Sequence, residues 1–143
     1  MYVAAVFLPL LGSLIAGLLG RKLGDRGAQV ITCAGVGVSA VLAVAIFLDV
    51  AIGGHGRTVT LFSWISSGTF DVSWALKVDT LTAVMLLVVT SVSFMVHVYA
   101  VGYMHHDPSI PRFMSYLSLF TFCMLMLVTA DNLVQLFFGW EGV

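Results

Sequence analysis

The spacing of the charged residues constrains this chain more than any other feature. Asp, Glu, Lys and Arg make up only 9% of the sequence, and their positions leave four long apolar stretches without any of them. A helix needs about 20 such residues to cross the hydrocarbon core of a bilayer. The sequence therefore predicts an all-α polytopic membrane protein with four transmembrane helices, at about residues 2–20, 28–49, 80–102 and 112–130.

A fifth apolar run follows the last of these stretches. It opens at Asn132 and reaches Val143, where the sequence ends. Residues 132–143 are therefore expected to form the start of a fifth span. We expect residues 1–143 to be a single membrane domain and an N-terminal fragment of a longer protein.

Composition excludes several other classes of protein. Hydrophobic residues make up 60% of the chain, against roughly 45–50% in soluble globular proteins. Six Lys and Arg face seven Asp and Glu, so no basic field exists that would attract nucleic acid. Cys33 and Cys123 lie far apart without metal-ligand spacing, so we expect no metal site. The expected surroundings are a lipid bilayer and other membrane proteins.

The basic residues also predict an orientation. Arg21, Lys22 and Arg26 lie between the first two predicted spans, and the positive-inside rule places them in the cytoplasm or its equivalent. The N-terminus is then outside. The expected location is the bacterial cytoplasmic membrane, with the mitochondrial inner membrane as the alternative.

Residues 57–77 do not follow the helical pattern. Hydrophobic side chains occupy every second position at Phe70, Val72, Trp74 and Leu76, which is typical of a half-buried strand. A short Ser- and Gly-containing segment ahead of them suits a turn. We predict an external β-hairpin at about 57–77, lying across helix ends; the alternative is an amphipathic surface helix.

Glu141 is the one charged residue that the pattern places deep in the membrane. It follows Asp131 by ten residues, or about 15 Å along a helix, which is near the centre of a hydrocarbon core roughly 30 Å thick. An ionised carboxyl there costs about 2.5–3.5 kcal/mol, and its default interpretation is a proton or ion pathway. We predict proton transfer by Glu141. One alternative is that Glu141 is a protonated structural acid between helices. The other is that the fifth apolar run does not cross the membrane.

Three further residues are candidates for proton transfer. Asp79 stands at one predicted helix start and Asp131-Asn132 at another. Asp and Asn act first as N-caps there, so proton transfer by Asp79 or Asp131 is the second interpretation. His97 lies inside the third predicted span. A lone histidine in a bundle is usually a hydrogen-bonded structural group, although its neutral imidazole can also relay protons. No pattern in the chain predicts a cofactor-binding site.

Several segments together resemble a known family. The segments that carry the resemblance run from Asp79 to Thr82, from His97 to Tyr99, from Gly102 to Met104, at Arg112-Phe113 and Tyr116-Leu117, from Leu125 to Asn132, and from Phe138 to Val143. They are similar to the subunit L family, the distal antiporter-like, proton-pumping membrane subunits of respiratory NADH–quinone oxidoreductase (complex I). The resemblance covers the whole chain and is densest after about residue 74.

The resemblance carries several implications. It implies a large helical bundle with inverted repeats and broken helices, which pumps protons while a separate arm oxidises NADH. NADH, FMN, the iron–sulfur clusters and quinone are then expected on other subunits, and no redox site or cofactor in this chain. The glutamate that matches Glu141 belongs to the proton-input pathway and pairs with a lysine on a later helix. The sequence stops two residues after Glu141, so only one member of that pair is expected here.

Two alternatives to this function stay open. One is the large subunit of a multi-subunit sodium/proton antiporter, whose beginning is similar; neighbouring genes for redox subunits or for antiporter subunits would distinguish the two. The other is a truncated, non-transporting membrane fragment that serves at most as a scaffold. Its presence in, or loss from, a native-gel complex would test the scaffold role.

Overall fold

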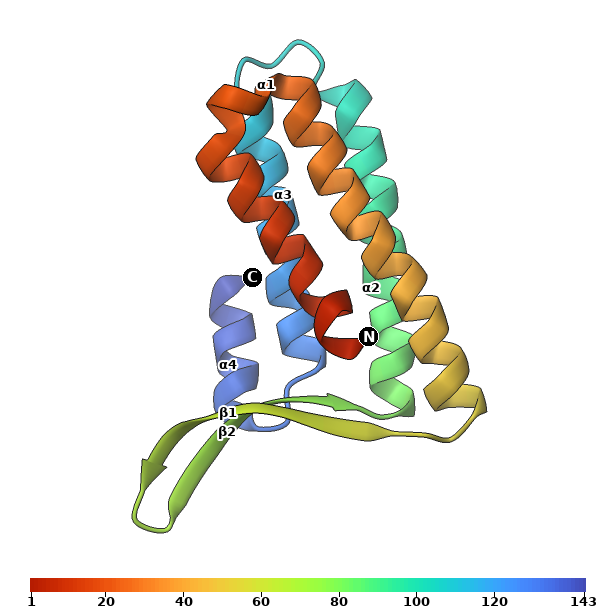
Figure 1. Cartoon of the computed structure of the whole chain (residues 1–143), viewed down its shortest axis with the longest axis vertical. Coiled ribbons are helices and arrows are strands. Elements are labelled where there is room, and N and C mark those ends of the chain that lie inside the picture. The colour runs from red at the N-terminus through yellow and green to blue at the C-terminus, as the bar shows by residue number, and fades with distance from the viewer.

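The computed structural model describes residues 1–143 and is mostly helical. Three helices are long and apolar enough to cross a membrane, and two strands form one antiparallel hairpin. The helices lie side by side, and the hairpin lies across one end of them (Figure 1). The elements in chain order are α1 (Tyr2–Phe47), the short π-helix η1 (Leu48–Ile52), β1 (Arg57–Ser67), β2 (Phe70–Val78), α2 (Thr80–Tyr103), α3 (Ile110–Val128) and α4 (Leu133–Gly142).

Helix α1 is bent back on itself at Gly24. Its 46 residues would reach about 69 Å as a straight helix, more than twice the thickness of a hydrocarbon core. Gly24 has φ 72°, a left-handed conformation that glycine adopts without steric cost. The two arms on either side of Gly24 run antiparallel (Figure 1). The predicted connection at residues 21–27 was too wide, because only Gly24 leaves the helical conformation.

The first arm of α1 packs closely against α3 through small residues. A Cβ added at Gly17 would lie 2.8 Å from Ser115 Oγ, and one at Gly20 would lie 2.8 Å from Pro111 Cβ. Ser115 Oγ donates a hydrogen bond to the Ser13 carbonyl at 2.8 Å. Small residues let helices approach closely where no water drives them together. We call this contact the α1–α3 seam.

Helix α3 begins earlier than the sequence pattern predicted. Pro111 was expected to lie in the connecting loop, but α3 starts at Ile110 with Pro111 in its first turn. Proline is well tolerated there because the backbone N–H that it lacks would have no helical partner. Helix α2 agrees with the prediction to within one residue.

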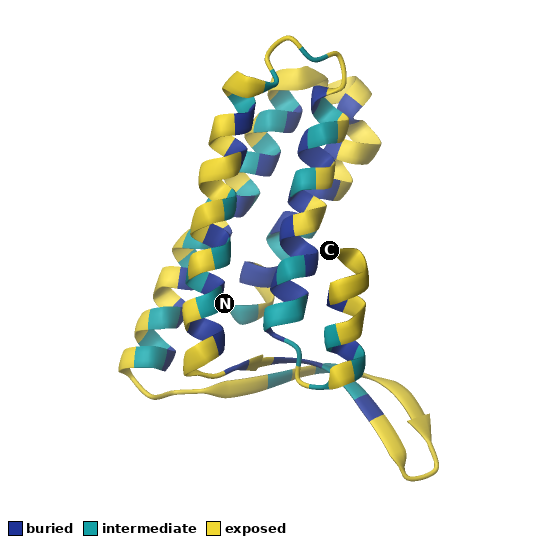
Figure 2. Cartoon of the chain, turned by 180° about the vertical axis from the view of Figure 1, so that it is seen from behind, coloured by how far each residue is buried: buried dark blue, intermediate teal, exposed yellow.

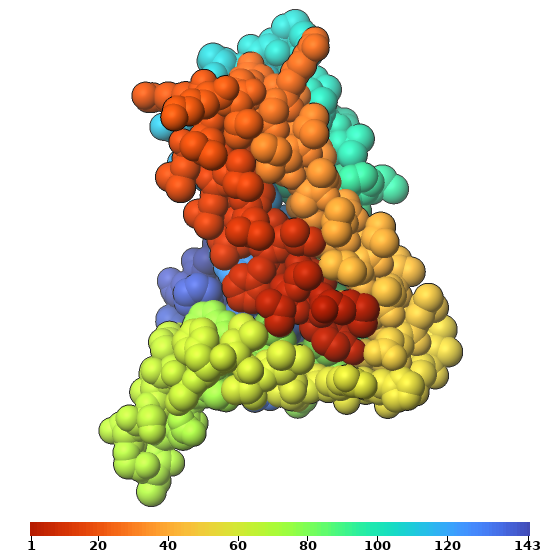
Figure 3. Space-filling model, viewed as in Figure 1, coloured from red at the N-terminus to blue at the C-terminus, as the bar shows by residue number.

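The predicted hairpin is confirmed. Strands β1 and β2 pair antiparallel from Arg57 opposite Val78 to Ser67 opposite Phe70, and Gly68 with φ 62° lies in the turn. The turn projects beyond the body of the protein (Figure 3). The alternative of an amphipathic helix is therefore wrong.

Backbone and side-chain hydrogen bonds hold the hairpin against the helix ends. The Lys77 N–H donates to the Thr129 carbonyl at 2.9 Å, and Asn132 Nδ2 donates to the Ser73 carbonyl at 2.8 Å. Gln135, which is fully buried, accepts from the Ala75 N–H through Oε1 at 3.1 Å. These bonds fix β2 across the start of α4, as the sequence analysis expected for a hairpin lying over helix ends.

Buried residues gather on the facing sides of the helices, and exposed residues gather on the outward sides (Figure 2). The main apolar cluster joins α1, η1, β2, α2 and α3, and includes the fully buried Ile46, Leu76 and Leu86. Many large apolar side chains remain exposed on the outward faces. Such faces suit contact with lipid or with further membrane segments.

Helix α4 contacts α3 through two glycines. A Cβ at Gly139 would lie 2.7 Å from the Cα of Leu127, and one at Gly142 would overlap the Cys123 side chain. Helix α4 agrees with the predicted fifth run, and Asn132 caps it by accepting from the Gln135 N–H at 2.8 Å. The glycines therefore set how closely α4 approaches α3.

We expect Gly139→Ala to destabilise the full-length protein by about 1–3 kcal/mol, because the added methyl meets α3 backbone and the two helices must separate. The measurement is the thermal melting temperature of the purified protein in detergent. Gly102→Ala is the matched control, since a Cβ at Gly102 meets nothing within 4 Å. Equal melting temperatures for the two variants would contradict the close contact.

Candidate functional site

The structure distributes the four candidate residues along the bundle instead of bringing them together. Asp79 and Asp131 lie at the end covered by the hairpin, where α2 and α4 begin. Glu141 is eight residues after the first residue of α4, or about 12 Å further along. His97 is seventeen residues after the first residue of α2, or about 26 Å along it. The candidates therefore occupy three depths, and none contacts another.

Glu141 lies on an open face of α4. Gln135, Gly139 and Gly142 recur at intervals of four and three residues and form the face turned to α3 and the hairpin. Each residue turns about 100° round a helix axis, so Glu141 lies well off this face. Its side chain is exposed, and the structure gives it no hydrogen bond or ion pair.

The chain offers Glu141 no basic partner at its own depth. Four of the six basic residues lie at the end formed by the Gly24 bend and the α2–α3 connection, and the other two lie in the hairpin. The former are Arg21, Lys22, Arg26 and Arg112, and the latter are Arg57 and Lys77. Within residues 1–143, no basic residue therefore lies at the depth of Glu141.

His97 belongs to a buried chain of polar groups between α2 and α3. Its ring is 0% exposed, and Nδ1 lies 2.7 Å from the Ser93 carbonyl and 3.4 Å from Ser93 Oγ. Ser93 Oγ in turn hydrogen-bonds Thr121 Oγ1 on α3. A tautomer with the proton on Nδ1 satisfies the carbonyl.

The other ring nitrogen of His97 has no partner. Nε2 is buried and makes no hydrogen bond in the structure, and a buried unpaired polar atom is costly. With Nδ1 protonated, Nε2 is the atom free to accept a proton. Ser93 and Thr121 also line a groove of about 330 Å³ between α2 and α3, whose other walls are mostly apolar. His97 is thus a buried base at one end of a chain of hydroxyl groups.

Asp79 acts as an N-cap, as its first interpretation predicted. Its Oδ1 accepts a hydrogen bond from the Thr82 N–H at 2.8 Å at the start of α2. The bond to this backbone N–H lowers the pKa of the Asp79 carboxyl from its ordinary value, and partial burial opposes the effect. Asp79 therefore has a structural role that the geometry accounts for.

Asp131 does not cap α4. The cap is its neighbour Asn132, while Asp131 is exposed and accepts no hydrogen bond. The sequence pattern correctly placed a cap at this helix start but did not distinguish the two adjacent residues, since Asp and Asn cap almost equally well.

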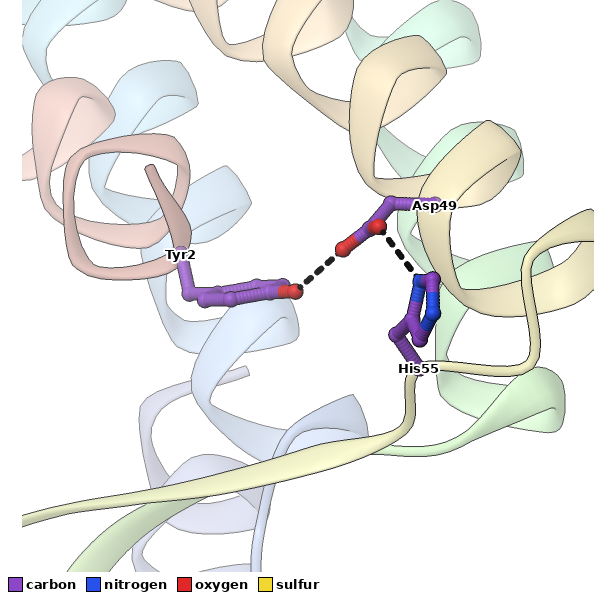
Figure 4. A network of polar contacts seen from close by, with 3 residues as sticks. All are labelled: Tyr2, Asp49 and His55. Carbon is purple, nitrogen blue, oxygen red and sulfur yellow. Dashed lines mark hydrogen bonds and ion pairs between the residues drawn. The ribbon is translucent and has the colours of Figure 1, made fainter.

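Sequence reasoning missed a polar network at the hairpin end. Tyr2 Oη donates to Asp49 Oδ2 at 2.9 Å, and His55 Nδ1 lies 3.0 Å from Asp49 Oδ1 (Figure 4). The network joins the start of α1, the π-helix η1 and the loop before β1. Tyr2 lies 47 residues before Asp49 in the sequence, and the three residues follow no motif, so no sequence signal pointed to the network. The Asp49 side chain is 37% exposed and that of His55 62%, so this network lies at the protein surface.

The fold and these residues define the class of protein: an integral membrane segment, mostly helical, with a buried histidine and an unpartnered acid on an outward face. The profile of a family described as NADH-ubiquinone oxidoreductase (complex I), chain 5 N-terminus, matches residues 64–114. Over all 143 residues the chain is 53% identical to NADH-ubiquinone oxidoreductase chain 5 of Arabidopsis thaliana and of Triticum aestivum, and 52% identical to that of Chondrus crispus.

These comparisons confirm the resemblance that the sequence predicted. The chain is similar over its whole length to relatives named NADH-ubiquinone oxidoreductase chain 5. It spans about a fifth of the length of these relatives, 21% of the first two and 22% of the third.

The Asp79 cap can be separated from a role in proton transfer. We expect Asp79→Ala to destabilise α2 by about 1 kcal/mol at neutral pH, whereas Asp79→Asn keeps the cap. The native pKa is lowered, so the carboxylate contributes its stability above the ordinary pKa of about 4 and loses it as the pH falls through the lower native value. The loss of stability in Asp79→Ala relative to the wild type should therefore become smaller as the pH falls. Melting temperatures of both variants across pH 3–7 measure this, and a large deficit in Asp79→Asn at pH 7 would contradict the cap.

Proposed function

We propose that this chain is the N-terminal part of the proton-pumping membrane subunit of a proton-translocating NADH–quinone oxidoreductase, and that Glu141 is a titratable carrier in its proton channel. Identity of 53% over the full chain to complex I chain 5 is the observation that carries the proposal. The relatives are named as chain 5 of NADH-ubiquinone oxidoreductase. These names favour the proposed function over that of the large subunit of a sodium/proton antiporter.

We infer that α1 crosses the membrane twice, so that its two arms, α2 and α3 form four spans and α4 begins a fifth. The length of α1 and the bend at Gly24 support this count. Four of six basic residues lie at the bend end, and the positive-inside rule then places this end inside and the N-terminus outside. The proposal keeps both locations, the bacterial cytoplasmic membrane and the mitochondrial inner membrane.

Glu141 is suited to carrying protons by its position and its open face. Intramembrane acids face a polar cavity or a partner, because an ionised group in hydrocarbon is costly. The face that bears Glu141 also bears the exposed Phe137 and Trp140 nearby. Coverage of this face by later helices of the same subunit or by other complex I membrane subunits would give the acid its partner and exclude lipid.

His97 is the candidate relay on the other side of the bundle. Its Nδ1 is engaged with Ser93, while Nε2 is unpartnered, so one nitrogen can accept a proton as the other donates. The proposal places NADH, FMN, the iron–sulfur clusters and quinone on other subunits. This chain then contributes proton transfer and no redox step.

The test of Glu141 uses the intact complex reconstituted in vesicles. We expect Glu141→Gln to lower the number of protons moved per electron while NADH oxidation and assembly persist, because the amide has nearly the same shape but cannot titrate. Glu141→Asp is the matched control and should retain part of the pumping. Unchanged proton stoichiometry in Glu141→Gln would contradict the proposal.

The relay is tested by His97→Gln in the same vesicles. The amide preserves a hydrogen-bonding side chain in the buried site, so assembly is expected to persist while the rate of proton movement falls severalfold. Tyr99→Phe, a conservative change at an exposed position on α2, is the control. Equal proton movement in His97→Gln and Tyr99→Phe would show a purely structural histidine.

A further inference from the structure

A hollow lies at the bend end of the bundle, and neither Glu141 nor His97 lines it. It has a volume of about 710 Å³ and lies between the Gly24 bend of α1 and the start of α3. Its walls include Arg21 from α1 and Arg112 from α3. The close contact along the α1–α3 seam, which glycines allow, holds these two elements and therefore the two arginines at the same end of the protein.

The two arginines are free to bind an anion. The structure contains one ion pair, between His55 and Asp49 at the opposite end, so neither Arg21 nor Arg112 is neutralised. Asp25 is the one carboxylate that lines the hollow. Guanidinium groups bind phosphate through paired, charge-assisted hydrogen bonds. Ser109 and Tyr116 add hydroxyl groups to the same walls.

Apolar stripes lead away from both arginines along the helices. On α1, Leu18 and Leu14 precede Arg21 by three and seven residues and are 81% and 47% exposed. On α3, Tyr116 and Phe120 follow Arg112 by four and eight residues and are 62% and 47% exposed. Residues at these intervals share a helix face. A phosphate held by the arginines would thus have exposed apolar surface beside it, in the direction of the bilayer core.

We propose that this hollow binds the phosphate headgroup of an anionic phospholipid, with the acyl chains lying along the two apolar stripes. Basic pockets between membrane helices at the inner surface are suited to such headgroups. We name the site, formed by Arg21, Arg112, Ser109 and Tyr116, the headgroup pocket. The proposal depends on the membrane placement of this end and not on the proton-transfer roles of Glu141 or His97.

The test measures phospholipid retention by the intact complex, purified in detergent and incubated with phosphatidylglycerol or cardiolipin, using native mass spectrometry. We expect Arg21→Gln with Arg112→Gln to weaken retention about 100-fold, because the phosphate loses the charge-assisted hydrogen bonds of two guanidinium groups. Lys22→Gln with Arg26→Gln is the matched control, since it removes the same charge from the same end but neither residue lines the pocket. Retention in this control should change little.

Further variants cover the case in which the double Gln variant fails to assemble. Arg21→Lys with Arg112→Lys keeps both charges but loses the paired geometry, so it should retain lipid more weakly than the wild type. Asp25→Asn removes the opposing carboxylate and should strengthen retention severalfold. An unchanged or weaker retention in Asp25→Asn would count against the pocket.

Three further outcomes overturn the proposal. Equal losses in the two double Gln variants would mean a general surface potential and no pocket. Equal retention in all variants would mean that the arginines do not bind lipid. Displacement of the lipid by millimolar inorganic phosphate, with phosphate bound in its place, would assign the pocket to a free anion and not to a phospholipid.

Discussion

The α1–α3 seam is the contact on which the rest of the bundle depends. Lipid offers no hydrophobic driving force between helices, so close packing and hydrogen bonds must hold them. Gly12, Gly17 and Gly20 bring α1 to within van der Waals contact of α3 or of its own second arm. At this distance, Ser115 and Ser118 on α3 reach the carbonyls of Ser13 and Pro9.

Much of the fold was predictable, because it follows from two periodicities in the sequence. Long uncharged stretches predicted the helices, and alternation around Trp74 predicted the hairpin to within a few residues. The connections were harder to predict. Charges at residues 21–27 suggested a loop, yet one glycine suffices for the bend. Pro111 suggested a loop end, yet a proline fits equally well in a first helical turn.

The site could be predicted only as a set of residue types. A deep acid and a deep histidine stand out in an apolar chain, and the sequence pattern made Glu141 and His97 candidates for that reason. It could not find the hydroxyl partners of His97, because serine and threonine are common in membrane helices and only the packing of α2 on α3 brings Ser93 to Thr121. Nor could it find the Tyr2–Asp49–His55 network, in which Tyr2 reaches Asp49 only after α1 folds back on itself.

The central claim is that the outward face of α4 is completed by residues beyond this chain, which make Glu141 part of a proton channel. The most direct measurement is a structure of the intact complex from its native membrane in which side chains are resolved. The account predicts a lysine ammonium from outside residues 1–143 within about 4 Å of the Glu141 carboxylate, the usual limit for an ion pair. A Glu141 side chain in contact with lipid alone, or paired only within residues 1–143, would contradict it.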